Sequence, residues 1–176
     1  TKNRNTKKKA SEDFFQAEDG IRDRSPSRGL GDVYKRQLET IAVADIKKRK
    51  WMKLFALTAI GPLSSVFNLH HTDLYITNKN QKVSRSLGKQ IILETRAVAK
   101  ADGVDVTEDE CLEMFNKIVD SKQTNKSSMC FDILNKRKTE IEFINGAVAK
   151  IGKSHGIKTP MNDLMYNMIM VKEGMY

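Results

Sequence analysis

The 176-residue sequence predicts an all-α fold, a helical bundle with a disordered tail at its N-terminal end. Beyond residue 37, apolar residues recur every three to four positions, which is the spacing of one helix face. The chain has only 3 prolines and 10 glycines, so few positions would interrupt a helix. No segment alternates apolar and polar residues as a half-buried strand does. These observations favour one helical domain over residues 38–176.

Residues 1–37 mix lysine runs and acidic clusters without periodicity, so we expect a disordered or non-native tail. The segment from Phe14 to Gln37 resembles a translated sequencing-adapter read-through, and the origin of residues 1–13 stays open. Gly29-Leu30-Gly31 lacks the preceding strand and the third glycine of a phosphate-binding loop. We therefore set this tail apart from the fold, as with other added segments.

Asp45 is predicted to cap the first long helix, after a short apolar lead-in over residues 38–44. Gly61-Pro62 should break this helix, because proline cannot donate the helical hydrogen bond, and a continuation over residues 63–69 is expected. The apolar positions of the helix are Ile46, Trp51, Leu54, Phe55 and Ile60.

A second helix should start near Val83 and stop at Asp102-Gly103. Glu94 interrupts its apolar face once. Thr107 and Glu110 form a capping box that opens a third helix. The apolar positions are Leu87, Ile91, Val98 and Ala101 in the second helix, and Leu112, Phe115, Ile118 and Val119 in the third.

Three further helices are expected towards the C-terminus. Ser127-Ser128 precedes a short helix that ends at Leu134. Thr139 and Glu142 form a second capping box, and the helix that follows should end at Gly156. Pro160 starts the last helix. The apolar positions of the last two helices are Ile141, Ile144, Val148 and Ile151, followed by Leu164, Met165, Met168 and Ile169.

The net charge of +9 weakly suggests a nucleic-acid binder, but its distribution argues against one. Residues 1–37 contribute +4, and the remaining +5 is spread over several helices without interleaved aromatic residues. Cys111 and Cys130 are too few and too far apart for a zinc site or a disulfide framework, and the adjacent His70 and His71 make a poor metal pair. We expect no metal, no nucleic acid, no membrane span and a cytoplasmic location.

Residues 127–162 contain the most specific motif of the chain. It reads S-S-M-x-x-D-(x)7-E-I-[DE]-x-I-N-G-(x)8-H-G-I-x-T-P-x-N. This motif resembles the C-terminal helical domain of the 2-dehydropantoate 2-reductase (ketopantoate reductase) family, a bundle of the 6-phosphogluconate dehydrogenase C-terminal type. The resemblance extends from about Leu38 to the C-terminus, and it implies that an N-terminal Rossmann domain is missing from the chain.

The resemblance implies NADP-dependent reduction of 2-dehydropantoate to (R)-pantoate in pantothenate synthesis. The cofactor would bind mainly to the missing domain, so we expect this fragment alone to be inactive. The expected partners are a small 2-oxo acid and the Rossmann domain in cis, and a homodimer is left open. Neither the choice of NADP over NAD nor the oligomeric state follows from the residues present. The alternatives are a stand-alone helical interaction or dimerisation module and a reductase of another 2-oxo acid.

The family's lysine lies in a W-x-K-L context, which is matched here by Lys53. The resemblance assigns Lys53 to proton donation at the substrate's keto oxygen, and burial against apolar neighbours would lower its pKa. A snorkelling surface lysine is the structural alternative. The resemblance also assigns Ser128 to the substrate carboxylate and Glu140 to hydrogen bonding of substrate or cofactor.

One departure from the family pattern affects the expected substrate. The family places asparagines four and eight residues after the lysine, whereas this sequence has Leu57 and Gly61 there. Two amides that would bind a hydroxylated, carboxylated substrate are therefore absent, so the exact 2-oxo acid stays open. Asn68 could supply one amide from a different direction.

Overall fold

The computed structural model describes residues 45–121 and 126–176, and within these ranges the chain forms helices joined by turns, with no strand. This confirms the all-α prediction. The predicted tail over residues 1–37 and the lead-in over residues 38–44 lie outside the described ranges. The elements are α2 (Ile46–Phe67), the π-helix η3 (Asp73–Thr77), α3 (Gln81–Ala101), α4 (Glu108–Asp120), α5 (Ser128–Leu134), the 3₁₀ turn η4 (Ile141–Phe143), α6 (Asn145–His155) and α7 (Pro160–Glu173).

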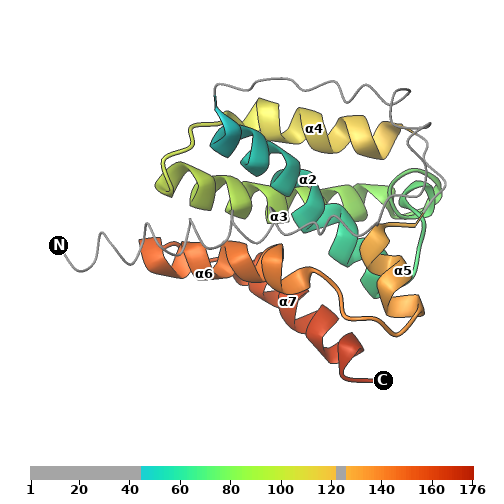
Figure 1. Ribbon diagram of the computed structural model, residues 1–176. Helices are drawn as coiled ribbons and strands as arrows, with labels where there is room; N and C mark the ends of the chain where they lie inside the picture. The colour runs from blue at the N-terminus through green and yellow to red at the C-terminus, as the bar shows by residue number, and fades with distance from the viewer. Residues whose placement is uncertain (1–44, 122–125) are drawn as a thin grey trace, which may run out of the picture.

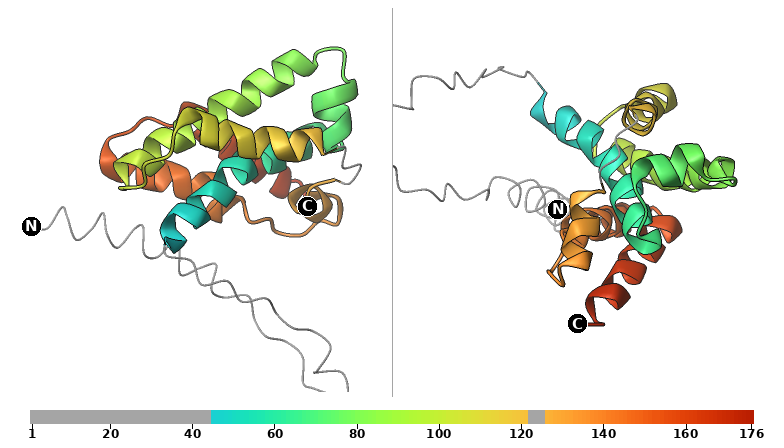
Figure 2. Two further views of the ribbon diagram at one scale, coloured as in Figure 1. Left: turned by 90° about the horizontal axis from the view of Figure 1, so that it is seen from above. Right: turned by 90° about the vertical axis from the view of Figure 1, so that its right-hand side faces the viewer.

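The helix α2 is the central element of the bundle. It crosses obliquely over α3 and also contacts α4 and α7, while α5 packs beside its C-terminal half (Figure 1; Figure 2). Almost every residue from Leu54 to Ser65 is buried, so this part of α2 has no solvent-facing stripe. A helix that is buried on all sides has its position fixed by every neighbour that contacts it. Side chains on α2 are therefore well placed to build a rigid site.

The predicted break at Gly61-Pro62 is wrong, because α2 continues to Phe67. Pro62 cannot donate a hydrogen bond to the carbonyl of Thr58, four residues earlier. The amide Nδ2 of Asn145 donates to that carbonyl instead, at 3.0 Å. Asn145 comes from α6, so a contact that is distant in sequence satisfies the group that proline leaves free. The helix ends one turn later, where Asn68 adopts a left-handed conformation at φ 55°.

Glu94 caps the last helix and does not simply interrupt an apolar face. Its carboxylate accepts the backbone N–H groups of Met161 and Asn162 at 2.9 and 3.0 Å, and the Nδ2 of Asn162 at 3.0 Å. The first N–H groups of a helix have no partner within the helix, so this carboxylate satisfies the start of α7. On α3 the predicted apolar positions Ile91 and Val98 are buried and Leu87 packs against the core, whereas Ala101 is exposed.

Local capping signals were correct for several helices. The side chain of Asp45 caps α2, and Thr107 and Glu110 form the expected capping box of α4. Ser127 caps α5. Gly156 ends α6 at φ 72°, a conformation that glycine adopts without strain. Pro160 is the first residue of α7.

The second capping box is wrong, because α6 begins at Asn145 and not after Thr139. The Oγ1 of Thr139 donates to the carboxylate of Glu173 at 2.6 Å and so contacts the end of α7. The apolar residues predicted for the helix that would follow this box are buried nevertheless. On α7 the prediction holds for Met165 and Ile169, which are buried. It is wrong for Leu164 and Met168, which are exposed.

Candidate active site

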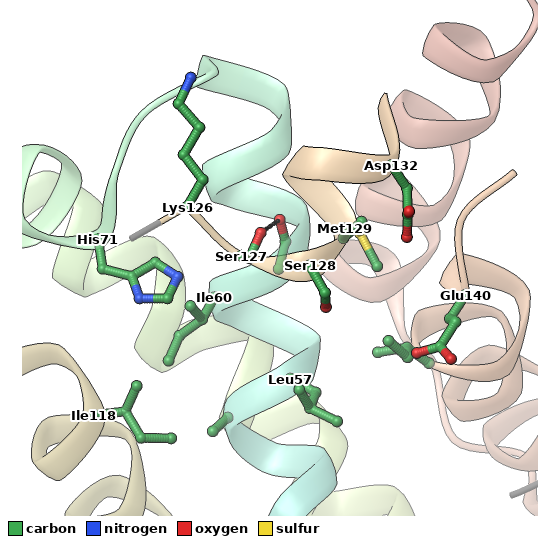
Figure 3. Close-up of a pocket in the computed structure, with 13 residues that line it drawn as sticks. Leu57, Ile60, His71, Ile118, Lys126, Ser127, Ser128, Met129, Asp132 and Glu140 are labelled. Atoms are coloured by element: carbon green, nitrogen blue, oxygen red, sulfur yellow. Dashed lines mark hydrogen bonds between the residues drawn. The ribbon is translucent and has the colours of Figure 1, made fainter. Parts of the chain in front are cut away.

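A pocket of about 280 Å³ lies against the middle of α2. Figure 3 shows that one wall comes from α2, a second from the segment around Ser127 and Ser128 that leads into α5, and a third from the turn that carries Glu140. Most of the α2 wall is apolar and includes Leu57 and Ile60. A mainly apolar cavity with a few polar groups is typical of a small-molecule site.

The two adjacent serines have different tasks. The Oγ of Ser127 accepts the N–H of Cys130 at 3.2 Å and lies 2.7 Å from the Oγ of Ser64, so this side chain is committed to the structure. Ser128 is exposed, lines the pocket and does not cap the helix. The hydroxyl of Ser128 is therefore the one that is available to a ligand.

Glu140 lines the opposite side of the pocket from a turn. Its backbone carbonyl accepts the N–H groups of Phe143 and Ile144, at 2.9 and 3.1 Å, which fixes the turn. Its side chain is exposed and makes no capping bond to η4. The structure thus brings Ser128 and Glu140 to one cavity, although they are twelve positions apart in the sequence.

Lys53 stands next to this pocket but does not line it. It lies one helical turn before Leu57 on α2, so both side chains project from the same face of the helix. Trp51 and Leu54 of the W-x-K-L motif are buried, whereas Lys53 is exposed. The structure therefore does not bury Lys53 against its apolar neighbours as we expected.

Asn68 does not line the pocket either. Its Oδ1 accepts the amine of Lys126 at 2.6 Å, and its backbone carbonyl accepts the same amine at 3.2 Å. Lys126 does line the pocket, so Asn68 holds a pocket residue in place. Its amide oxygen is already bonded in this arrangement.

His71 is a pocket residue that the sequence interpretation missed. Its side chain lines the cavity, the residue is only 8% exposed, and neither ring nitrogen has a hydrogen-bond partner among the described residues. Burial, and to a lesser degree the neighbouring His70, lower the pKa of His71. A buried donor or acceptor without a hydrogen-bond partner costs about 1–3 kcal/mol, so most buried polar groups in proteins have one. Only the tertiary fold distinguishes His71 from His70, which is not part of the pocket wall.

The lowered pKa of His71 predicts a pH-dependent stability. As the pH falls from about 7 through the ordinary histidine pKa of 6.5, His71 takes up a proton in the unfolded chain more readily than in the folded chain. The free energy of unfolding should therefore decrease as the pH decreases in this range. Above about pH 7 both states are neutral and this contribution is constant. Denaturant midpoints measured between about pH 5 and 8 should show a flatter dependence for His71→Gln than for the wild type. Equal slopes would contradict this expectation.

Two kinds of site find no support in the described ranges. No group of three or more His, Cys, Asp or Glu side chains is arranged to hold a metal ion there. Within the same ranges, no helix is both long and apolar enough to cross a membrane.

Comparison with known proteins places this geometry in a family context. Residues 45–173 match the family model described as "Ketopantoate reductase PanE/ApbA C terminal". A 2-dehydropantoate 2-reductase of Pyrobaculum aerophilum is 27% identical over 165 residues, which is 86% of this chain and 57% of the relative. The enzyme of that name from Escherichia coli O157:H7 is 29% identical over 84% of this chain and 46% of the relative. The chain thus spans about half the length of the curated relatives it matches.

Solved structures show the same fold. A D-mandelate dehydrogenase in complex with NADH and anilino(oxo)acetate superposes with a TM-score of 0.69 at 24% identity, over 76% of this chain and 42% of that one. A PanE/ApbA family ketopantoate reductase from Ralstonia eutropha JMP134 gives a TM-score of 0.68 at 23% identity, over 76% of this chain and 43% of that one. In both cases roughly half of the solved chain has no counterpart here.

Proposed function

Because the chain belongs to the ketopantoate reductase family through its C-terminal domain, we propose that it is the substrate-binding half of an NADPH-dependent 2-oxo acid reductase. The observation that carries this proposal is the convergence of Ser128 and Glu140 on one pocket (Figure 3), whose α2 wall includes Leu57, one helical turn after Lys53. The expected product from 2-dehydropantoate is pantoate. We assign the reaction to the cytoplasm, where a biosynthetic reductase would draw on NADPH.

Each of these residues has a role that its position supports. Lys53, exposed and adjacent to the pocket, would donate a proton to the keto oxygen as it gains negative charge. Ser128 would donate a hydrogen bond to the substrate carboxylate, and Glu140 would orient the substrate or the cofactor from the opposite wall. Asn68 would act indirectly by holding Lys126.

In this proposal the cofactor binds to a separate dinucleotide-binding domain, which the described residues do not contain. A dinucleotide needs a glycine-rich loop between a strand and a helix, and the described residues contain no strand. The hydride would come from NADPH bound to that domain. The exposed side chains of Lys53 and Glu140 are positioned to be covered when such a domain closes over the pocket. Closure would remove water from the site and strengthen its electrostatic interactions.

A second candidate is a reductase of a different 2-oxo acid. Its support is the apolar Leu57 and the side-chain-free Gly61, where the family pattern has two amides. Such a loss would lower the discrimination in favour of a hydroxylated substrate.

A homodimer is a further part of this proposal. The C-terminal end of the domain exposes large apolar side chains, with Val171 at 69% and Met175 at 80%. Exposed apolar residues in one region favour association. Sedimentation of the 176-residue chain should show a dimer, and a monomer at all concentrations would contradict this.

The proposal is tested by comparing the domain alone with the domain joined to a dinucleotide-binding partner. We expect residues 38–176 to fold and to show no NADPH oxidation with 2-dehydropantoate, because the described part of this range has no strand and therefore no loop of the kind that binds a dinucleotide. Circular dichroism would confirm the helical fold, and absorbance at the NADPH band would follow turnover. Steady-state turnover by the isolated domain would show that the chain is a different kind of enzyme from the one proposed.

A further inference from the structure

His71 is a buried polar group for which neither the fold nor the roles assigned above account. It lines the pocket at 8% exposure, with Nδ1 and Nε2 both unpartnered among the described residues. Figure 3 shows its ring projecting into the cavity beside Ile60 of α2. An imidazole in this position is available to a ligand that enters the pocket.

The surroundings of His71 leave few other polar groups at this end of the pocket. The wall next to it is formed by Ile60 of α2 and Ile118 of α4 (Figure 3). A Cβ atom placed on Gly61 would lie in ordinary van der Waals contact with the thioether of Met129, 3.6 Å from its Cε, so an apolar side chain lines the pocket at this position. Two further polar groups line this part of the pocket, and both are already bonded: the amine of Lys126 to Asn68, and the hydroxyl of Ser127 to Ser64 and to the N–H of Cys130. Recognition of an uncharged polar group here therefore falls to His71.

The residues that line the pocket beside His71 indicate which part of a substrate it would meet. Lys53 and Gly61 are separated by eight residues, which is about 12 Å of helix. The reacting carbonyl belongs at the Lys53 end, whereas His71 lines the pocket together with Ile60 and Gly61. His71 thus faces the non-reacting end of a bound molecule.

The chemistry of the ring indicates the kind of group. Burial lowers the pKa of His71, so the ring is neutral near pH 7. A neutral imidazole has one N–H donor and one acceptor nitrogen. A hydroxyl group can pair with either nitrogen, because it both donates and accepts, whereas a carboxylate only accepts.

We propose that His71 is a specificity-determining residue that binds a hydroxyl group at the non-reacting end of a 2-oxo acid, while Leu57, Ile60 and Met129 contact the apolar middle of that molecule. This inference rests on the proposed function and narrows its substrate class. It also accounts for the absence of amide side chains at Leu57 and Gly61. The hydrogen bond to the hydroxyl group would come from His71, in the segment after α2, and not from α2 itself.

The test is an NMR titration of the 176-residue chain labelled with ¹⁵N, including its histidine rings. The two ligands are 2-dehydropantoate and 3,3-dimethyl-2-oxobutanoate, which differ only in the hydroxyl group. We expect the ring nitrogens of His71 to shift saturably with the hydroxylated ligand alone. The dissociation constant for 2-dehydropantoate should be about tenfold lower than that for 3,3-dimethyl-2-oxobutanoate, which corresponds to the contribution of one hydrogen bond.

Variants at two adjacent histidines provide the controls. His71→Leu should remove the tenfold difference between the ligands, and His71→Gln, which keeps a donor and an acceptor, should retain part of it. His70→Gln should leave the difference unchanged, because His70 does not line the pocket. If His71→Leu does not fold, the wild-type comparison of the two ligands still decides.

The possible failures are distinguishable. Shifts of the Ser128 and Met129 amides with both ligands, at equal affinity and without a response from the His71 ring, would overturn the role of His71 and leave a 2-oxo acid site intact. No saturable shift of any pocket residue with either ligand would overturn this inference and count against the proposed function as well.

Discussion

Replacing Lys53 with alanine is expected to lower kcat by about 10²–10⁴-fold in the enzyme that this domain completes, the usual range for a positioned general acid. Lys53 is exposed and lies one helical turn from the pocket residue Leu57, directly before the part of α2 that is almost entirely buried. Its backbone position is therefore fixed while its side chain is free to reach a substrate. Because proton donation stabilises the transition state and not the bound substrate, KM should change much less than kcat.

Two matched variants separate this role from a general effect of charge. Lys53→Arg keeps the positive charge, but its guanidinium does not release a proton near neutral pH, so kcat should stay low. Lys150→Ala removes an exposed lysine on α6 that is absent from the wall of this pocket and should leave kcat unchanged. Steady-state kinetics with 2-dehydropantoate would measure both parameters. A Lys53→Ala enzyme with near wild-type kcat would remove Lys53 from the chemistry.

Replacing Glu94 with alanine is expected to destabilise the domain by about 2–3 kcal/mol, the upper range for hydrogen bonds to a charged group. The change removes the acceptor of two backbone N–H groups at the start of α7 and of the Nδ2 of the buried Asn162. Asn162 also accepts from the Nδ2 of Asn145, whose other bond supports α2 at Pro62. The loss should therefore reach beyond α7.

Chemical denaturation of residues 38–176 measures this effect. Glu94→Gln keeps one acceptor oxygen without the charge, so its stability should lie between those of Glu94→Ala and the wild type. Glu113→Ala removes an exposed carboxylate from α4 and should change the free energy of unfolding by less than about 0.5 kcal/mol. A Glu94→Ala domain as stable as this control would show that the cap contributes little.

Sequence patterns predicted those features of the fold that depend on neighbours within one helical turn. The capping box of Thr107 and Glu110, the glycine cap at Gly156 and the proline start at Pro160 are all of this kind. The family motif similarly placed Ser128 and Glu140, which the structure brings to one pocket.

Features that depend on distant contacts were not predictable in this way. Pro62 reads as a helix break until Asn145 is known to bond the carbonyl of Thr58. From the sequence alone, Glu94 is a charged residue that interrupts an apolar helix face. Only the fold shows that its carboxylate accepts a backbone N–H group at the start of α7. The same holds for the site. The sequence gives no reason to prefer His71 over the adjacent His70, and only the fold places His71 in the pocket.

Steady-state NADPH oxidation tests the central claim most directly. The protein to assay is residues 38–176 joined to the dinucleotide-binding domain of a 2-dehydropantoate 2-reductase from the same family, with 2-dehydropantoate and other 2-oxo acids as substrates. We expect turnover with at least one of them, and its loss on replacement of Lys53. A folded protein that binds NADPH but reduces no 2-oxo acid would contradict the assignment of this domain as the substrate-binding half of such a reductase.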